Sequence, residues 1–339
     1  MSAISNPKKI QISHFQRRTM GKVFSLESIG QFIREELQDH FRFEKKINYF
    51  YSIGFFRRFA DGFLAKFREG DINHIMGDIH YLAIFLDSRK TILTIADCVS
   101  LNRLNGFKQK IIMFFWYYIP VKRSSVVVVI SEFVKNELLG YVKCDPSKIK
   151  VIHVPLLTDI NLNLSLKLSS KPVKNILHIG STENKNLFRH VDALQDLPIN
   201  FIFVGEPSAE QENHIINKCF SYQIVSDLSD SDLIDLYDSS DLLLFASTYE
   251  GFGMPIIEAQ SRGLPVITSN ICSMPEIAGG GACLVNPYDV EDIKAAILEI
   301  SINHDLRKEL IKEGFNNITR FQPNKISEEY AKLYYEINK

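Results

Sequence analysis

Long hydrophobic segments are absent from this sequence. The longest uninterrupted apolar run, residues 111–119, has nine residues, whereas a membrane-spanning helix needs about 20. The opening residues 1–9 are polar and do not resemble the apolar core of a secretory signal peptide. We therefore expect no transmembrane helix and a cytoplasmic location.

Cysteine is also scarce. The five cysteines are scattered along the chain, without a CxxC pair or a Cys–His spacing typical of zinc sites: Cys98, Cys144, Cys219, Cys272 and Cys283. This pattern is typical of reduced thiols rather than of a disulfide framework or a zinc site. We expect no bound metal and no other cofactor.

Net charge is nearly absent too, at −1, but the two halves differ. Residues 1–150 carry a formal charge of +10 and residues 151–339 carry −11. This asymmetry indicates that one half meets an anionic partner, although segregation of charge by chance stays open as the alternative. We expect no nucleic-acid partner.

Short apolar runs alternate with segments of helical spacing along the chain. Strands are predicted at residues 9–15, 71–75, 91–95, 125–130, 148–154, 175–179, 201–204, 242–246, 264–268 and 282–285. Helices are predicted at residues 26–37, 131–139, 229–237, 255–263, 290–300 and 306–315, and another from Leu187 onward. The alternation predicts an α/β fold with doubly wound parallel sheets. Residues 159–172 have no clear period and predict a linker between a domain at 1–160 and a domain at 173–321.

Two segments, 41–68 and 108–123, combine aromatic with basic residues. Roughly helical spacing in the first predicts a pair of amphipathic helices of the kind that settle on an anionic membrane surface. Alternatively, the aromatics are core and the basic residues are a solvated face. Basic residues flank the aromatics of the second segment on both sides, which favours the membrane interpretation.

A glycine loop follows the predicted strand at 242–246. Gly251 and Gly253 allow positive φ and a close approach of the backbone to a ligand. Pro255 fits the first position of a helix, which would end at Gly263. Glycines, helix start and buried strand together predict a ligand site at this strand end.

Charged groups surround this loop. Glu250 precedes the predicted helix and Glu258 lies within it, so both carboxylates can address one ligand. Taken alone, Glu250 could merely complement the helix dipole, and Glu258 could be a surface residue. Two further loops contribute Gly180, Ser181 and Lys185 after residue 179, and Gly205 after residue 204. Parallel strands end at one sheet edge, so all three loops are expected to face one crevice, although Lys185 could equally be solvated.

The pattern S-x-x-E-G-F-G-x-P-x-x-E-A-x-x-x-G-x-P-V, residues 247–266, resembles the E-x7-E signature of retaining GT-B glycosyltransferases of family 4, also called group 1. Residues 178–186 and 126–138 add to the resemblance. It implies a GT-B fold, with two Rossmann-like domains, an active-site cleft between them, and a C-terminal helix, 322–339, that crosses back onto the first domain.

The resemblance also implies roles for individual residues. Glu250 would lie against the donor sugar and Glu258 would bind the nucleotide ribose. Lys185 would hold the diphosphate together with the backbone amides of Phe252, Gly253 and Met254. The donor would be a UDP- or GDP-linked sugar, and the leaving phosphate would help to deprotonate the acceptor, so that neither a protein nucleophile nor a metal is required.

Two departures from the family pattern concern catalysis. Ser181 stands where relatives have an arginine, which leaves Lys185 as the main cation, with Arg189 or Arg262 as substitutes. Ala96 precedes Asp97 where many relatives have a His-Asp pair, and His80 is our candidate to replace that histidine. A lone histidine is more often an ordinary polar group. The glycine-rich turn of relatives is reduced to Gly21.

The sequence therefore predicts a retaining glycosyltransferase that acts on a lipid-linked or surface-polysaccharide saccharide. Two alternatives stay open. One is another GT-B activity, such as an epimerase or phosphorylase, and the other is a catalytically silent sugar-nucleotide-binding protein.

Overall fold

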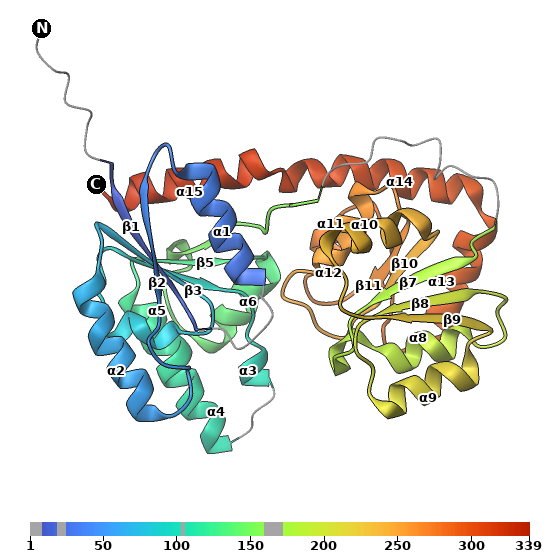
Figure 1. The fold of residues 1–339 in the computed structure, drawn as a ribbon, viewed down its shortest axis with the longest axis horizontal. Helices are drawn as coiled ribbons and strands as arrows, with labels where there is room; N and C mark the ends of the chain where they lie inside the picture. Colours follow the sequence, from blue (N-terminus) through green and yellow to red (C-terminus); the bar gives the residue numbers. More distant parts are fainter. Residues whose placement is uncertain (1–8, 19–24, 103–105, 159–171) are drawn as a thin grey trace, which may run out of the picture. The chain divides into compact units, whose positions relative to one another are not determined.

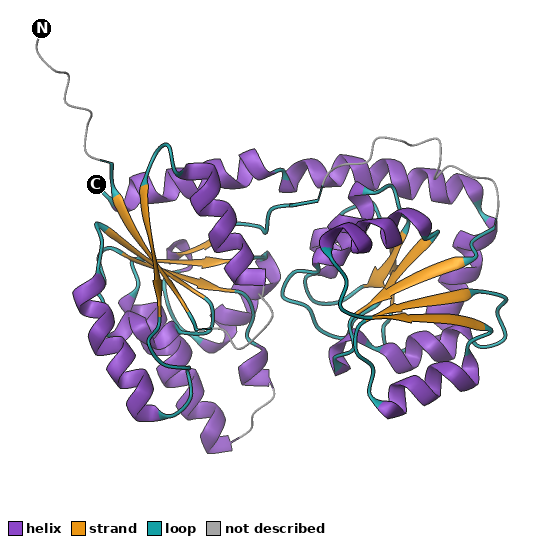
Figure 2. Cartoon of the chain, viewed as in Figure 1, coloured by secondary structure: helices purple, strands orange, loops and turns teal. Residues whose placement is uncertain are grey.

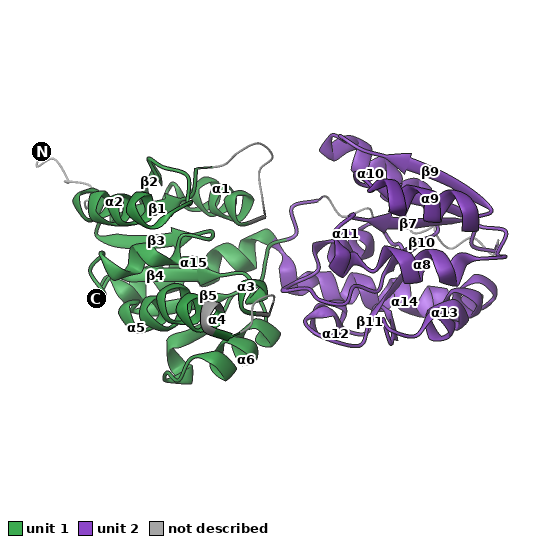
Figure 3. Cartoon of the chain, turned by 90° about the horizontal axis from the view of Figure 1, so that it is seen from below, with its two compact units in different colours: residues 1–155, 323–339 green, residues 156–322 purple. Residues whose placement is uncertain are grey.

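The chain is described by a computed structural model that covers residues 9–18, 25–102, 106–158 and 172–339. Gly21 and all but the last residue of the predicted linker 159–172 lie outside these ranges. The chain forms two compact units, one of residues 1–155 with 323–339 and one of residues 156–322 (Figure 3). The C-terminal residues are thus part of unit 1.

Unit 1 contains a six-stranded parallel sheet in the order β2-β1-β3-β4-β5-β6 (Figure 1). Its strands are β1 (Gln11–Gln16), β2 (Arg42–Ile47), β3 (Ile72–Met76), β4 (Thr91–Ile95), β5 (Val126–Val129) and β6 (Ile149–Val151). Its helices are α1 (Ser25–Leu37), α2 (Phe55–Ala65), α3 (Val99–Asn102), α4 (Gly106–Ile112), α5 (Ile119–Arg123), α6 (Glu132–Tyr141) and α15 (Pro323–Ile337). Single turns are η1 (Lys66–Arg68), η2 (His80–Ile84), the π-helical η3 (Met113–Tyr118) and η4 (Pro146–Lys148).

Unit 2 contains a second six-stranded parallel sheet, in the order β12-β11-β10-β7-β8-β9. Its strands are β7 (Asn175–Ile179), β8 (Asn200–Val204), β9 (Ser221–Val225), β10 (Leu242–Phe245), β11 (Val266–Ser269) and β12 (Cys283–Val285). Its helices are α8 (Leu187–Leu194), α9 (Ala209–Lys218), α10 (Asp230–Ser239), α11 (Met254–Ser261), α12 (Met274–Ala278), α13 (Val290–Ile302) and α14 (His304–Ile318), with turns η5 (Glu183–Lys185) and η6 (Thr319–Phe321).

Helices cover both faces of each sheet (Figure 2). The central strands are therefore buried on both sides, and every residue of β3, β4, β10 and β11 is buried. Only β10 is apolar throughout, whereas β3, β4 and β11 also bury polar side chains such as His74, Thr94 and Thr268. In unit 2 the strands and the helices pack together in one core that includes Ile176, Phe201, Leu244 and Ile297. The predicted α/β class with two doubly wound domains is confirmed.

The first half of the segment 41–68 is not a helix, contrary to the sequence prediction. Residues 42–47 form edge strand β2, which pairs in parallel with β1. The four charged residues of β2, Arg42, Glu44, Lys45 and Lys46, suit an edge strand because one of its sides remains open to solvent. The second half is helical as predicted, as α2 and η1.

Three elements of unit 2 were not predicted, helices α9 and α12 and edge strand β9. The residues of β9 are exposed or half-buried, so the strand lacks the apolar run that reveals central strands. Helix α9 has a capping box between Ser208 and Gln211, which was the available signal. Helix α11 also begins one residue earlier than predicted, at Met254, and its C-cap is Arg262.

Helix α15 is anchored in unit 1 by a buried hydrogen-bond network. The Tyr334 hydroxyl lies 2.9 Å from His14 Nε2 and 2.8 Å from His74 Nδ1, and His74 Nε2 lies 2.7 Å from Thr94 Oγ1. The Tyr334 ring packs edge-on against Phe41, at 5.4 Å between centroids. A C-terminal helix is thereby fixed to strands β1, β3 and β4.

Candidate functional site

The carboxyl ends of β7, β8 and β10 carry the loops that the sequence singled out. Gly180 and Gly205 follow their strands with φ of 102° and 146°, and Gly253 has φ of 109°. These angles favour glycine. At Gly180 an added Cβ would lie 2.9 Å from the Lys185 side chain, so glycine also leaves room for that lysine.

The structure brings Lys185 and Glu250 together, although they lie 65 residues apart in sequence. Lys185 Nζ donates to Glu250 Oε1 at 2.7 Å and lies 4.6 Å from the centroid of the Phe245 ring. Both side chains are mostly buried, at 20% and 14% exposed. A ligand that binds here can replace this ion pair, because Lys185 can contact an anionic group and Glu250 can accept from sugar hydroxyls.

Asn184 fastens the loop after β7 to the loop after β10. Its amide donates to the Tyr249 carbonyl at 2.9 Å and to Glu250 Oε1 at 3.3 Å. The Asn184 backbone carbonyl accepts from the Thr248 amide at 2.8 Å. Sequence analysis assigned Asn184 no role, and its only signal was its place next to Lys185.

The loop before α11 is fixed from its other side by Ser273. The Ser273 hydroxyl is buried and lies 2.8 Å from the carbonyl oxygens of both Glu250 and Phe252. Helix α11 then begins with Gly253 as N-cap and no side-chain cap. Because the helix dipole and uncapped amides attract negative charge, this end of α11 suits a phosphate group.

Glu258 lies within α11, one turn beyond the helix start. Its Oε2 accepts from the Tyr237 hydroxyl at 2.7 Å. Burial raises the pKa of Glu258, and the Tyr237 hydrogen bond opposes this shift. Tyr237 was not predicted because nothing in its sequence surroundings distinguishes it from a core aromatic.

Two buried histidines lie beneath this sheet edge. His178 Nε2 lies 2.9 Å from the Gly180 carbonyl, and His190 Nε2 lies 3.2 Å from the Ala246 carbonyl. Their Nδ1 atoms are 2.9 Å apart. Burial lowers the pKa of both rings, that of His178 to about 4. The pair positions the ends of β7 and β10.

The arginines considered as substitutes for the missing loop arginine have other partners. Arg262 Nε donates to Asp238 Oδ1 at 2.8 Å. Arg189 donates to Asn186 Oδ1 at 2.9 Å and lies 5.4 Å from the centroid of the Tyr288 ring. Ser181, in the arginine's place, accepts from Gln211 through its carbonyl at 2.8 Å. Lys185 is therefore the cation that contacts Glu250.

The other predicted catalytic residues, His80 and Asp97, lie in unit 1. His80 Nδ1 lies 2.9 Å from the Trp116 carbonyl, which can only accept, so Nε2 is the basic nitrogen of the neutral ring. Burial lowers the pKa of His80, against an opposing effect of Asp78 and Asp97. Burial raises the pKa of Asp97, which accepts from the Val99 amide at 3.0 Å. The two groups are electrostatic neighbours.

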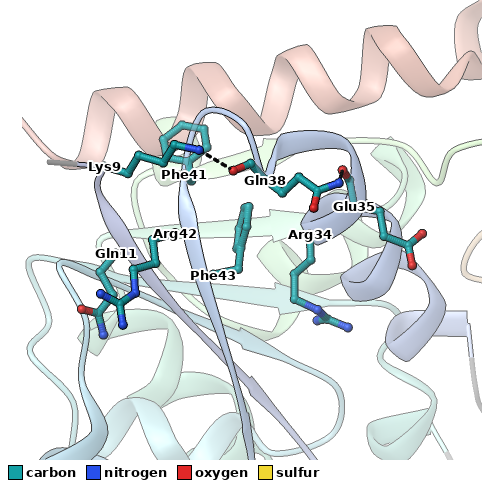
Figure 4. A pocket seen from close by; sticks show the side chains of 8 residues that line it. All are labelled: Lys9, Gln11, Arg34, Glu35, Gln38, Phe41, Arg42 and Phe43. Carbon is teal, nitrogen blue, oxygen red and sulfur yellow. Dashed lines mark hydrogen bonds between the residues drawn. The ribbon is translucent and has the colours of Figure 1, made fainter. Parts of the chain in front are cut away.

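A pocket of about 650 Å³ in unit 1 lies at the edge of the unit 1 sheet where strands β1 and β2 begin (Figure 4). Gln11 and Arg42, the first residues of β1 and β2, line it together with Phe41 and Phe43. The Lys9 ammonium there already donates to the Gln38 carbonyl at 2.9 Å. Ligands of doubly wound sheets bind at the carboxyl ends of the strands, so this pocket is not the candidate site.

Comparison with known proteins gives a family match for the second unit. Residues 167–317 match the family model described as "Glycosyl transferases group 1". The resemblance to this family is confirmed for these residues. They include Lys185, Glu250 and Glu258.

Curated relatives include mannosyltransferases. The O-antigen chain mannosyltransferase B of Escherichia coli is 43% identical over 24% of this chain and 21% of its own length. The O-antigen chain mannosyltransferase RfbU of Salmonella typhimurium is 27% identical over 62% of this chain and 61% of its own length. The first curated relatives are thus matched over about a fifth of their length or less.

Solved structures match over nearly the whole chain. A glycosyltransferase from Rickettsia africae has a TM-score of 0.72 at 21% identity and covers 98% of this chain and 99% of its own. Anabaena HepE in complex with UDP-glucose has a TM-score of 0.75 at 15% identity, with 96% of this chain and 100% of its own covered. The predicted GT-B fold is confirmed.

Proposed function

We propose that this protein is a retaining glycosyltransferase, which moves a sugar from a nucleotide-sugar donor to an acceptor hydroxyl. The observation that carries the proposal is the Lys185–Glu250 pair at the carboxyl ends of β7 and β10, beside the uncapped start of α11. A lysine, a carboxylate and a helix N-terminus together match the charges of a diphosphate and the hydroxyls of a sugar. The relatives described above support it.

The residues of unit 2 divide the donor between them in this proposal. Glu258 accepts hydrogen bonds from the ribose hydroxyls, with Tyr237 holding its carboxylate in place. Lys185 and the amides at the start of α11 bind the diphosphate, and Glu250 contacts the sugar. Binding the diphosphate draws the Lys185 ammonium toward the phosphate, where it stabilises the charge that grows as the sugar leaves.

Retention in this proposal needs neither a protein nucleophile nor a metal ion. The leaving phosphate oxygen takes the proton of the acceptor hydroxyl as the new bond forms on the same face of the sugar. Unit 1 would bind the acceptor, and His80 with Asp97 would help to position the reacting groups. The acceptor class we propose is a lipid-linked or surface-polysaccharide saccharide, as the names of the mannosyltransferase relatives suggest.

A panel of nucleotides tests the donor site. At a hundred times its dissociation constant, UDP or GDP should stabilise the protein by about 2.7 kcal/mol, because it binds the folded state alone. Glu258→Gln should weaken this binding at least about tenfold, a loss of about 1.4 kcal/mol. Thermal shift against UDP, GDP, ADP and CMP, with Glu212→Gln on the exposed face of α9 as control, measures both effects.

Release of nucleotide from labelled sugar nucleotides then tests the transfer itself. Binding of a nucleotide without hydrolysis or transfer to any acceptor would support the alternative of a catalytically silent binding protein. Failure of every nucleotide to bind would contradict the donor site.

We also propose that unit 1 associates peripherally with the cytoplasmic face of an anionic membrane. The described residues contain no helix that is long and apolar enough to cross a membrane. Core packing explains Phe41 and Tyr117, which are buried, but not Phe55, Phe56 and Phe67, which are 71%, 86% and 73% exposed. Exposed aromatics beside basic residues suit a headgroup boundary.

Sedimentation with vesicles tests this association. The protein should co-sediment with phosphatidylserine-containing vesicles at low salt and less so at high salt, because charge attraction is screened. Vesicles of neutral lipid are the control. A protein that stays in the supernatant with anionic vesicles at low salt would contradict the proposal.

A further inference from the structure

Helix α2 buries its small and polar side and exposes its aromatic side. Its buried residues are Asp61, Gly62 and Ala65. Asp61 accepts hydrogen bonds from the backbone amides of Tyr49 at 2.9 Å and Phe50 at 3.3 Å. Most amphipathic helices of globular proteins are oriented the opposite way. The aromatic side chains of α2 therefore remain exposed in the folded protein, and exposed apolar side chains of this kind indicate a binding site.

A pocket of about 560 Å³ opens between α2 and the helical segment 111–116. Its apolar wall includes Phe55, Phe59, Phe85, Ile111, Phe115 and Trp116. The Phe85 ring can pack against α2 because residue 62 of the helix is glycine. A Cβ at Gly62 would lie 2.2 Å from that ring. This volume is within the usual range for small-molecule sites, roughly 300–1,000 Å³.

Few charged groups line this pocket, and they are placed precisely. The Arg58 guanidinium lies 4.3 Å from the centroid of the Trp116 ring, and its Nη2 donates to the Ser52 carbonyl at 2.8 Å. Trp116 Nε1 donates to Asp78 Oδ1 at 2.8 Å. Arg58 is thus held in one orientation, and a guanidinium has further donors for a phosphate.

One residue of the pocket wall, Trp116, contacts a predicted catalytic residue of unit 1. The Trp116 carbonyl accepts from His80 Nδ1 at 2.9 Å. His80 and Tyr117 then lie edge to face, at 5.4 Å between centroids, and the Tyr117 hydroxyl reaches the Asp97 carbonyl at 3.4 Å. A ligand in the pocket would hold its attached groups near His80 and Asp97.

We propose that this pocket binds the hydrocarbon chain of a phosphate-linked lipid that carries the acceptor saccharide, with Arg58 on the phosphate. The proposal rests on the proposed function, since it names the acceptor class of that reaction. Two observations select this occupant over a wholly apolar or wholly polar one. The wall is mostly apolar, and Arg58 is a fixed cation within it, matching a chain that ends in a phosphate. The Asp78 carboxylate, which is also in the wall, accepts from Trp116 Nε1.

Trp116 provides a direct readout, because it is the single tryptophan of the chain. Geranylgeranyl phosphate and dodecyl phosphate, each titrated below its micellar concentration, should change its fluorescence saturably. The two probes distinguish a branched chain from a straight one. Inorganic phosphate at the same concentrations is the headgroup control and should leave the fluorescence unchanged.

Two matched pairs of variants locate the binding. Phe59 lines the pocket and Phe63 does not, yet both belong to α2 and are 54% and 52% exposed. Phe59→Asn should weaken probe binding at least about tenfold and Phe63→Asn less than about twofold, because only the first loses apolar contact with the chain. Arg58→Gln should weaken it more than Arg57→Gln, whose side chain is exposed outside the pocket.

Three outcomes would overturn the proposal: no saturable change with either probe, equal losses for Phe59→Asn and Phe63→Asn, or a response only when vesicles are present. Equal losses would show that the probe does not occupy the pocket, and a response only with vesicles would show that the aromatics of α2 contact a bilayer and not a single lipid chain. Thermal unfolding of each variant controls for loss of the fold. The titration requires no nucleotide, so failure of the donor site in unit 2 would be seen separately from failure of this pocket.

Discussion

Lys185→Met is expected to lower kcat/KM by about 10²- to 10³-fold, the usual loss when one preorganised charge-stabilising donor is removed. Lys185 is the cation that the structure places on Glu250, at 2.7 Å. Without it, the leaving diphosphate keeps the amides at the start of α11 but loses its counter-charge. Initial rates with the sugar nucleotide found in the nucleotide panel measure the effect.

The matched control for Lys185→Met is Lys218→Met. Lys218 forms a comparable ion pair in the same unit, with Asp192 at 2.6 Å, but at the end of α9. Its loss should leave kcat/KM within about twofold, because Lys218 lies away from the ends of β7 and β10 and partly exposed ion pairs contribute little to stability, typically below about 1 kcal/mol. Equal losses in the two variants would contradict the assigned role of Lys185.

A double variant separates a catalytic pair from a structural one. If the Lys185–Glu250 contact served only the fold, Lys185→Met with Glu250→Gln should recover function, since neither partner is left as an unpaired, mostly buried charge. If both side chains bind the donor, the double variant should remain at least as impaired as either single one. Recovery of activity would therefore show that the pair is structural.

The sequence predicted the positions of these strand ends well, for a simple physical reason. Strands buried on both faces are rich in apolar residues, and β10, with the sequence LLLF, stands out for that reason alone. Glycines with positive φ then mark the loops. The contact between Lys185 and Glu250 could not be predicted, because a pairing across 65 residues depends on the strand order β10-β7.

Helix α2 shows the limit of periodicity. Its spacing predicted an amphipathic helix, and a helix is present from Phe55 to Ala65. Which side faces inward was undetermined, because it depends on Asp61 binding backbone amides and on Gly62 admitting Phe85. Both are tertiary contacts. The same ambiguity led to a helix prediction for residues 42–47, since an edge strand and an amphipathic helix can share a mixed pattern.

Family resemblance gave a different sort of prediction from strand patterns and helix periodicity, namely roles for individual residues. Resemblance suggested Glu258 for the ribose, and the structure adds that Tyr237 holds its carboxylate. It suggested an arginine where Ser181 stands, and the structure shows that Arg262 has Asp238 as its partner. Motifs thus give candidate chemistry, while the partners that orient each group come from other parts of the fold.

Unit 1 should lose stability in acid because of the network that anchors α15. Arg34 Nη1 can donate to His14 Nδ1 at 3.4 Å, which leaves His14 Nε2–H to donate to Tyr334. Tyr334 then donates to His74 Nδ1, and His74 Nε2–H donates to Thr94. His74 can accept from Tyr334 and donate to Thr94 only when it is neutral, since an imidazolium has no acceptor nitrogen.

The pKa shifts of the two histidines determine whether the free energy of unfolding rises or falls with pH. Burial lowers the pKa of His74 to about 3 and lowers that of His14 well below 6.5, and the neighbouring His74 lowers the pKa of His14 further. A group with a lowered folded pKa contributes its stability above its unfolded pKa, near 6.5, and loses it as the pH falls toward the folded value. By about pH 4.5 the His74 ring should cost the fold roughly 2 to 3 kcal/mol, and the lowered pKa of His14 adds a loss of the same sign.

Urea unfolding followed between about pH 7.5 and 4.5 measures this loss, with His74→Gln as the test variant and His40→Gln as its control. The introduced amide side chain can still donate to Thr94 and accept from Tyr334 but cannot titrate, so the pH slope of the unfolding free energy should fall by up to about one proton below pH 6.5. His40 is exposed, and its replacement should leave the slope unchanged. An unchanged slope in His74→Gln would mean that the acid loss originates in other groups, and that the neutral network does not anchor α15.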